Sequence, residues 1–462
     1  MNRIRITEKH HADIYSHLFP GDGMEAVGIA LCGKHFYKGN QTLLVQDFYP
    51  VPYDVCERTE DYIRWSTDFI NPLLEKAQKE NLSLLKIHCH PSGYDRFSDL
   101  DSESDYALFS SVHSWLQSNY PHSSCVMLPD GKLFGRFFHE NMEEEIVHQF
   151  SIIGSDIKSW HYSDNELSVK SEAFKRNEQA FGKKTVKLLS KMKIAVVGCS
   201  GTGSPSIEQL TRLGVGTLVL VDNDYLDTVN LNRILGSNYT QALSKISKVD
   251  LLEAHVREIG LDTKVESFRS NLVNEDVIRA VADCDVIFGC VDSAEGRHIM
   301  DLLSAYYIIP LIDIGVKFDA DGQGGINGLF GSVHYVKPFG SSLMSRGQYN
   351  LEQVASEEIK RRNKEEFARN QYLVEAGESS PAVISINMQM SSIAVNELLA
   401  RIHPYRTLSN AEIDVIRSNF SEAITFPDEL PESCPYFSKR VGKGSVYPLL
   451  NRLEFSINEK VV

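Results

Sequence analysis

Residues 193–221, KIAVVGCSGTGSPSIEQLTRLGVGTLVLV, carry the pattern that decides the fold of this chain. The apolar segment at 194–197 predicts a short buried strand, and a glycine-rich turn follows it at 198–203. Apolar residues then recur at helical spacing over 207–213, which predicts a helix ended by the glycine that follows. Another apolar segment, at 217–221, predicts a second strand. A strand, a glycine turn, a helix and a strand in this order begin a parallel α/β sheet.

The glycine turn is suited to binding phosphate. Gly198, Gly201 and Gly203 precede the predicted helix, whose first N–H groups and positive dipole end attract anions. Asp222 at the tip of the second strand is placed for a ribose hydroxyl. The spacing is G-x-x-G-x-G, because position 200 is Ser200, and it differs from the G-x-G-x-x-G of dinucleotide enzymes. By itself the turn fits any nucleotide-binding sheet.

Polar residues beyond the second strand make the assignment more specific. A second acid, Asp224, follows Asp222, and Asn230-Leu-Asn-Arg233 comes soon after. Together these residues resemble the adenylation domain of ubiquitin-activating enzymes and their bacterial relatives, the ThiF family, which adenylates sulfur-carrier proteins. The resemblance implies that Asp222 binds ribose, and that Asn230 and Arg233 hold the nucleotide phosphates. The implied cofactors are ATP and Mg²⁺.

The same resemblance assigns two further cations to the ATP phosphates. Lys248, which is followed by a valine, matches a phosphate-binding lysine of the family better than Lys245 does. Arg176 matches an arginine that reaches the phosphates, often those of the partner subunit's site. The alternative for Arg176 is an ordinary arginine on a helix surface.

An acid at the end of a later strand completes the adenylation set. Asp292 follows the apolar segment 284–290, and an acid in that position faces the ligand crevice of an open α/β sheet. The family uses this acid for magnesium, although Ser293 stands where an asparagine is usual. Four residues would stabilise phosphate charge during adenylation: Arg176, Arg233, Lys248 and Asp292.

A second motif lies near the N-terminus, at 88–101, HCHPSGYDRFSDLD. His88 and His90 are two apart on a predicted strand, so their side chains share one face and can bind one metal ion. Asp101, at the start of a predicted helix, can supply a third ligand. Two histidines and one carboxylate leave a fourth position open for water, which is the arrangement of catalytic zinc. The metal lowers the pKa of that water towards about 7.

The full H-x-H-P-x6-S-x-x-D spacing resembles the JAMM (JAB/MPN) metalloprotease motif, whose members remove ubiquitin-like proteins or trim their tails. The resemblance implies that Glu25 is the general base and that Ser98 hydrogen-bonds the developing oxyanion. The alternative for Glu25 is a solvated carboxylate at a strand end.

Composition limits the class of protein. The formal net charge of −15 argues against a nucleic-acid surface. The eight cysteines include no C-x-x-C pair, so neither a disulfide framework nor a zinc ribbon is expected, in keeping with a reducing cytoplasm. No apolar run approaches the length that spans a membrane. The 462 residues allow roughly three domains at about 150 residues each.

The expected fold class is α/β: a JAB/MPN α+β domain followed by a Rossmann-like adenylation domain with a mainly parallel sheet. We place these domains at 1–150 and 173–405, with a connector at 151–172 and a C-terminal extension at 406–462. Within them, a largely helical segment is expected at 61–80. Further expectations are a helix at 7–18, strands at 25–31, 41–48 and 84–88, and an apolar helix from Pro381 to Ile402. The region 317–380 is expected to be irregular, with one charged helical patch at 356–370.

The two motifs together predict a bifunctional enzyme acting on one ubiquitin-like protein. The first domain would trim or release the protein, and the second would adenylate its C-terminal glycine. The resemblance also implies a homodimer formed through the adenylation domain. No cysteine lies between Cys290 and Cys434, so we expect transfer to a thiol on a separate conjugating protein, with Cys434 as the alternative acceptor. A bacterial conjugation pathway in antiviral defence is an analogy from fused domains of this kind.

Other functions remain open from the sequence. The adenylation domain can instead serve sulfur-carrier activation or the adenylation of a peptide. One or both sites can be inactive, leaving a scaffold, although the complete sets of residues argue against this. An NAD-dependent oxidoreductase is the third alternative, and ATP–pyrophosphate exchange would separate it from the others.

Overall fold

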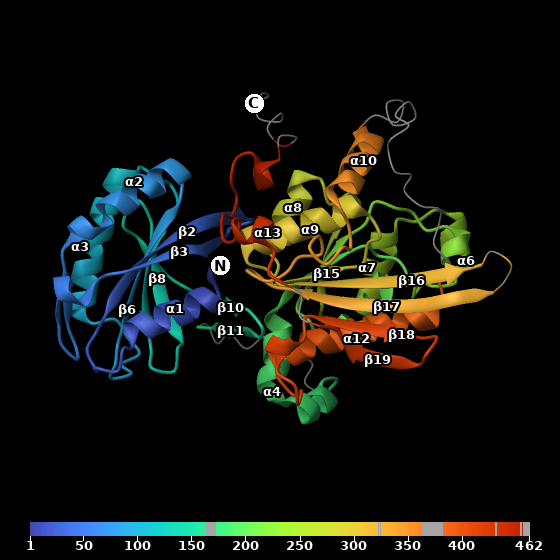
Figure 1. The fold of residues 1–462 in the computed structure, drawn as a ribbon, viewed down its shortest axis with the longest axis horizontal. Coiled ribbons are helices and arrows are strands. Elements are labelled where there is room, and N and C mark those ends of the chain that lie inside the picture. Colours follow the sequence, from blue (N-terminus) through green and yellow to red (C-terminus); the bar gives the residue numbers. More distant parts are fainter. Residues whose placement is uncertain are drawn as a thin grey trace. The chain divides into compact units, whose positions relative to one another are not determined.

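The computed structural model describes residues 1–162, 172–321, 323, 325–362, 382–429, 432–452 and 455. These residues divide between two compact units (Figure 1). The first unit draws on Met1–Asn165, Tyr306–Ile308 and Val441–Val462, and the second on Glu166–Ala305 and Ile309–Arg440. Within the described ranges, no helix is both long enough and apolar enough to span a membrane.

The first unit is built on a nine-stranded sheet in the order β11-β10-β1-β3-β2-β6-β7-β8-β9. The strands are β1 (Asn2–Thr7), β2 (Val27–Tyr37), β3 (Asn40–Pro50), β6 (Ser83–Cys89), β7 (His122–Met127), β8 (Leu133–Phe138), β9 (Glu144–Ile146), β10 (Gln149–Ile153) and β11 (Ile157–His161). The helices are α1 (Glu8–Leu18), α2 (Asn71–Glu80) and α3 (Asp99–Leu116).

Each face of this sheet has its own apolar core, because successive side chains of a strand point to opposite faces. In β2, Ala30 joins a core that includes Leu18 of α1, whereas Ile29 joins one that includes Leu74 of α2 and Phe109 of α3. The sheet is therefore covered by α1 on one face and by α2 and α3 on the other (Figure 1). The predicted helix at 7–18 is confirmed, with Thr7 as its N-cap.

Two boundaries predicted for the first unit are wrong. The largely helical segment at 61–80 is helical from Thr67, first as a 3-10 helix (Thr67–Ile70) and then as α2, with Pro72 in its first turn. Its first residues belong instead to a small hairpin of β4 (Cys56–Arg58) and β5 (Ile63–Trp65). The connector placed at 151–172 begins too early, because β10 pairs with β1 and β11 pairs with β10. β11 lies at the edge of the sheet and contains polar residues, so its sequence does not show the apolar pattern of a buried strand.

The second unit contains an eight-stranded sheet in the order β14-β13-β12-β15-β16-β17-β18-β19. The strands are β12 (Lys193–Val197), β13 (Thr217–Val221), β14 (Lys264–Phe268), β15 (Val286–Gly289), β16 (Leu311–Ala320), β17 (Ile326–Val336), β18 (Val415–Asn419) and β19 (Ile424–Pro427). The first five strands in this order run parallel and the last three are added antiparallel, which confirms the mainly parallel sheet predicted here.

Helices connect the strands of the second unit. They are α4 (Lys175–Lys191), α5 (Gly203–Arg212), α6 (Tyr239–Leu243), α7 (Lys248–Ile259), α8 (Glu275–Ala282), α9 (Ala294–Tyr307), α10 (Leu351–Arg362), α12 (Ile384–Ile402) and α13 (Pro435–Ser438). The helix predicted after the glycine turn is α5, and α12 packs against it and against β16 and β17.

The C-terminal part of the second unit is more regular than predicted. The region 317–380 is not irregular at its start, because β16 and β17 form a long hairpin there, whereas α10 overlaps the charged helical patch expected in this region. Residues 406–462 are not a separate extension, because β18 and β19 extend the sheet beside β17. β18 pairs with β17, a partner distant in the sequence, so local periodicity does not reveal it, and β19 then pairs with β18 as a local hairpin. Pro381 lies outside the described residues.

Candidate functional site

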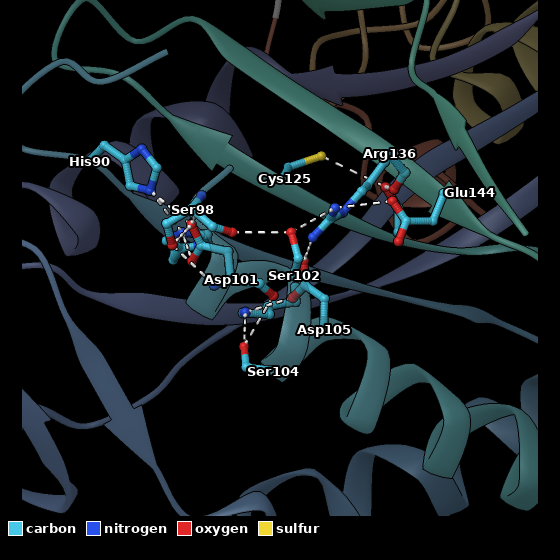
Figure 2. Close-up of polar contacts among 12 residues, drawn as sticks. His90, Ser98, Asp101, Ser102, Ser104, Asp105, Cys125, Arg136 and Glu144 are labelled. Carbon is cyan, nitrogen blue, oxygen red and sulfur yellow. Dashed lines mark hydrogen bonds and ion pairs between the residues drawn. The ribbon is translucent and has the colours of Figure 1, made fainter. Parts of the chain in front are cut away.

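In the first unit, the end of β6 and the start of α3 bring His88, His90 and Asp101 together. The Nε2 atom of His88 lies 3.0 Å from Oδ1 of Asp101, and Nε2 of His90 lies 3.4 Å from Oδ2 of the same carboxylate. The two Nε2 atoms are 3.2 Å apart. In the part of the chain that the structure describes, this is the one group of three or more such side chains that could hold a metal ion. Figure 2 shows His90 turned towards Asp101 and Ser98.

The donor atoms of this cluster fit a zinc ion. Nδ1 of His90 lies 2.7 Å from the carbonyl oxygen of Tyr94, so Nδ1 carries the proton and the Nε2 lone pair faces the cluster. Burial lowers the pKa of His88, which keeps that imidazole neutral. Although burial opposes it, the two histidines hold the pKa of Asp101 well below its usual range. Although burial opposes it, Asp101 and the carbonyl oxygen of Tyr94 raise the pKa of His90, so a metal bound there would displace a proton. Two imidazoles and a carboxylate are the donor groups of zinc sites.

Ser98 fixes the position of the Asp101 carboxylate. It is the N-cap of α3: the N–H of Asp101 donates to Oγ of Ser98 at 3.0 Å, and the N–H of Ser98 donates to Oδ2 of Asp101 at 2.8 Å. This is a capping box, which sets where the helix begins. The Ser98 hydroxyl also donates to Oδ2 of Asp101, at 2.7 Å. In this structure the hydroxyl therefore orients Asp101.

Glu25 lies just before β2 and faces the same cluster. Its Oε1 is 3.9 Å from Nε2 of His90, and the residue is only 5% exposed. A solvated strand-end carboxylate is therefore the wrong alternative. Burial raises the pKa of Glu25 to about 7, a value suited to a group that takes up and releases a proton near neutral pH. Glu25, Ser98 and Asp101 line one pocket with Trp65 of β5.

A buried charge network beside the cluster escaped the sequence analysis. Asp105 accepts from Lys86 at 2.7 Å and from Arg136 at 2.9 Å, and Arg136 also pairs with Glu144 at 3.0 Å. Figure 2 shows Asp105, Arg136 and Glu144 extending this network away from Asp101. Because buried charges need partners, the network ties the first turns of α3 to β6 and β8. Spacing could have predicted this network. Lys86 precedes His88 by two residues on a strand, and Asp105 follows Asp101 by one helical turn, so each shares a face with a residue of the cluster.

In the second unit, the glycine turn passes close to other backbone segments. A Cβ atom at Gly203 would lie 1.9 Å from the carbonyl oxygen of Gly198, and one at Gly198 would lie 2.4 Å from that of Cys290. Gly198 also has a φ of +94°. A Cβ at Gly201 would lie 2.4 Å from Nδ2 of Asn387 on α12, a residue that the sequence analysis missed. Glycine is therefore required at Gly198 and Gly203, where the neighbouring atoms belong to the backbone, whereas at Gly201 the side chain of Asn387 would have to move.

Asp222 braces the turn. Its Oδ2 accepts from the N–H of Cys199 at 2.7 Å, and its Oδ1 accepts from the N–H of Asp224 at 2.8 Å. Burial raises the pKa of Asp222. Asp224 in turn pairs with the buried Lys248 at 2.7 Å. Lys248 is the first residue of α7, whereas Lys245, predicted to lie in the same helix, falls between α6 and α7.

The other predicted phosphate ligands differ in their surroundings. Asn230 is buried, and its side chain accepts from the N–H of Asp227 at 3.0 Å. Nη1 of Arg233 donates to the carbonyl oxygen of Val229 at 3.0 Å. Arg176 is exposed on α4 and donates to Gln179, so the structure does not bring it to the other predicted residues.

Asp292 is exposed and lies just beyond β15, next to the strand that leads into the glycine turn. β12 and β15 are parallel neighbours, paired up to Val197 and Gly289. The strand order runs from β12 to β13 on one side and to β15 on the other, so the two ends flank a topological switch point. Ligands of open α/β sheets bind in the crevice at such a point.

Comparisons with known proteins agree with this description of the second unit. A model of the ThiF family matches residues 174–434, more than half of the chain. An adenylyltransferase and sulfurtransferase, UBA4 of Meyerozyma guilliermondii, is 31% identical over 145 residues, which are 31% of this chain and 33% of that protein. Ubiquitin-like modifier-activating enzyme 5 of Bombyx mori is 32% identical over 115 residues, 22% of this chain and 28% of that protein.

A third relative is a tRNA threonylcarbamoyladenosine dehydratase of Bacillus subtilis, 40% identical over 94 residues, 20% of this chain and 35% of that protein. The alignments thus span about a third of the length of these curated relatives. All three share with this chain a stretch far shorter than the whole.

Proposed function

Because the chain belongs to the ThiF family, we propose that its second unit is an ATP-dependent adenylyltransferase that activates the C-terminal carboxylate of a small carrier protein. The observation that carries this proposal is the switch point at the ends of β12 and β15, where the glycine turn approaches Cys290 and Asp292 follows soon after in the chain. The carrier class is a ubiquitin-like protein or a sulfur carrier. The names of two relatives, a ubiquitin-like modifier-activating enzyme and an adenylyltransferase and sulfurtransferase, support these two choices.

In this proposal the chain binds ATP through main-chain N–H groups and two basic side chains. The N–H groups of the glycine turn and the start of α5 face the phosphates, and Lys248 and Arg233 add positive charge. Asp292 would hold magnesium, which supplies further charge neutralisation when bound. The carrier carboxylate attacks the α-phosphorus, the bond to the leaving phosphate breaks, and acyl-adenylate and pyrophosphate form.

An exposed apolar face of the sheet supports a protein as the substrate. Phe330 of β17 lies in one cross-strand row with Asn419 and Ile424, and Phe426 follows Ile424 on the same face of β19. Phe330, Ile424 and Phe426 are 42%, 46% and 39% exposed. The opposite face is covered by α12, since a Cβ at Gly331 would touch Met390. Exposed apolar patches of this kind mark protein interaction sites.

The carrier proposal predicts how ATP–pyrophosphate exchange depends on the substrate. Exchange is expected with a carrier that ends in a free glycine carboxylate, and not with the same carrier amidated at that end, because only a carboxylate can attack. Phe330→Ser should raise the carrier KM about tenfold, since the variant loses an aromatic contact that the bound carrier would bury. Exchange that proceeds equally with the amidated carrier would contradict the proposal.

We further propose that the acceptor thiol lies on a separate protein. Cys434 is only 2% exposed and its N–H is bonded to the carbonyl of Gly340, which disfavours the alternative that Cys434 receives the carrier. Enzyme, ATP and carrier alone, analysed without reductant, should give no reductant-sensitive adduct. An adduct that is lost in Cys434→Ala would instead make Cys434 the acceptor.

A second function is favoured by one specific observation in the first unit, the convergence of His88, His90, Asp101 and Glu25. We propose that this unit is a zinc peptidase that hydrolyses the bond after the carrier's C-terminal glycine. Zinc bound by the two histidines and Asp101 would supply Lewis acidity. Glu25 accepts a proton from the attacking water and returns it to the leaving amine, while the amide C–N bond breaks. Ser98 keeps Asp101 oriented, and the earlier assignment to an oxyanion contact stays a prediction.

The peptidase proposal predicts one zinc ion per chain. His88→Ala combined with His90→Ala should remove the metal, because two of its three ligands are lost, and should abolish cleavage of a tailed carrier. The measurement is metal content by mass spectrometry after dialysis. His113→Ala is the matched control, because His113 donates to the carbonyl of Phe138 away from the cluster. Full zinc content in the double variant would refute the site.

A further inference from the structure

The loop that carries Glu25 has little to fix it by itself. It joins α1 to β2 over residues 19–26 and contains no helix or strand. Gly21 and Gly23 have φ values of +96° and +73°, and neither would meet another atom within 4 Å if it carried a Cβ. The main chain of such a loop has much conformational freedom. The position of Glu25 must therefore be set by contacts from elsewhere.

One guanidinium from the β4–β5 hairpin supplies most of these contacts. Nε of Arg58 donates to the carbonyl oxygen of Glu25 at 2.6 Å, and Nη2 lies 3.4 Å from that of Met24. Nη1 of Arg58 pairs with the carboxylate of Asp22 at 3.0 Å. The planar, five-donor guanidinium can hold three loop residues at once, which an ammonium group cannot do in the same geometry. The N–H of Glu25 donates to the carbonyl of Thr59, the next hairpin residue, at 2.7 Å.

Arg58 is itself held firmly. Its side chain is only 8% exposed, and its guanidinium lies 4.2 Å from the centre of the Tyr53 ring. Tyr53 stacks on His17 at 4.9 Å between ring centres and donates to the carbonyl of His17 at 2.6 Å. A cation between an aromatic face and carbonyl oxygens resists displacement.

The contact of Arg58 with Glu25 is to the main chain and leaves the carboxylate alone. A guanidinium paired directly with the Glu25 carboxylate would stabilise the ionised carboxylate and make Glu25 a weaker base. Here the Glu25 carboxylate faces His90 at 3.9 Å, while Arg58 donates to the main-chain carbonyl oxygen of Glu25. The arrangement therefore places the carboxylate without neutralising it.

We propose that Arg58 is a positioning residue for Glu25, and that the β4–β5 hairpin is the element that keeps the proton-transfer group aimed at the cluster. This inference rests on the proposed peptidase function of the first unit. The same hairpin region also lines the pocket that contains Glu25, through Tyr62 and Trp65. A substrate seated in the pocket therefore touches the element that holds Glu25.

The test compares Arg58→Ala, Arg58→Lys and Glu57→Ala. Glu57 is an exposed residue of the same hairpin that does not line the pocket, and it is the control. Arg58→Ala should lower kcat for a tailed carrier about 100-fold, with KM changed by less than about twofold, because misplacing a proton-transfer group lowers the rate of reaction more than it weakens substrate binding. Arg58→Lys should recover part of kcat, since it restores the positive charge beside Asp22 but not the planar set of donors that contacts the carbonyls of Met24 and Glu25. Glu57→Ala should behave as the parent protein.

Two readouts do not depend on turnover. Zinc content should stay at one per chain in all three variants, and hydrogen exchange at the Glu25 amide should rise in Arg58→Ala alone. Unchanged kcat in Arg58→Ala, an equal loss in Glu57→Ala, or loss of zinc would each overturn the inference while leaving the peptidase proposal standing. A zinc-loaded parent protein that cleaves no tailed carrier would refute the peptidase proposal, and the role of Arg58 with it.

Discussion

Asp292→Ala is expected to abolish ATP–pyrophosphate exchange, with a loss of at least about 100-fold, because it removes the carboxylate proposed to hold the magnesium that would neutralise phosphate charge. Asp292 lies beyond β15 at the switch point of the sheet and is exposed, so its replacement should leave the fold intact. Exchange of labelled pyrophosphate into ATP, in the presence of carrier and magnesium, is the measurement.

The control for Asp292→Ala is Glu295→Gln, on the neighbouring helix α9. The Glu295 carboxylate pairs with Arg361 at 2.9 Å and has no part in the proposed metal site, so this variant should retain most of the exchange. Cleavage of a tailed carrier should persist in Asp292→Ala, because the His88 cluster belongs to the other unit. Normal exchange in Asp292→Ala would show that magnesium is held by other groups.

Glu25→Gln is expected to lower the rate of cleavage by about 10²–10⁴-fold, the usual contribution of a positioned proton-transfer group. Glutamine preserves the shape of the side chain but cannot take up the proton. Zinc should remain bound, because the three ligand atoms come from His88, His90 and Asp101. Kinetics on a tailed carrier and metal analysis of the same preparation test both statements.

Glu57→Gln is the matched control for Glu25, since Glu57 is an exposed carboxylate on β4. It should leave both cleavage and zinc unchanged. Loss of zinc in Glu25→Gln would make Glu25 a ligand, and normal cleavage would remove it from the mechanism. Adenylation of an already trimmed carrier should be unaffected in either variant.

Sequence patterns predicted the local parts of both sites well. Residues 194–197 and 217–221 are buried strands, and the helix between them starts at Gly203. The ligand set of His88, His90 and Asp101 also came from spacing alone. These features are local, because strand alternation, helix capping and glycine turns act over a few residues.

Boundaries that depend on distant partners were predicted poorly. β10 pairs with β1 from the start of the chain and was mistaken in part for connector, and β18 pairs with β17 and was mistaken for an extension. β11 and β19 then continue these sheets as local hairpin partners, and they were missed with them. A short strand is stabilised by the neighbour it pairs with, and that neighbour can come from anywhere in the chain. The hairpin of β4 and β5 was missed for a related reason, since its three-residue strands are too short for periodicity to show.

The sequence by itself thus determined the glycine turn, the spacing that brings His88, His90 and Asp101 together, and the parallel character of the second sheet. Only the tertiary structure decided that Glu25 is buried against His90, that Asn387 packs on Gly201, and that Arg58 donates to the main chain of the loop that carries Glu25. The physical reason is the range of the interactions. Backbone preferences and side-chain periodicity are encoded in neighbouring residues, whereas burial, ion pairing and pKa shifts depend on which distant segments the sheet order brings together.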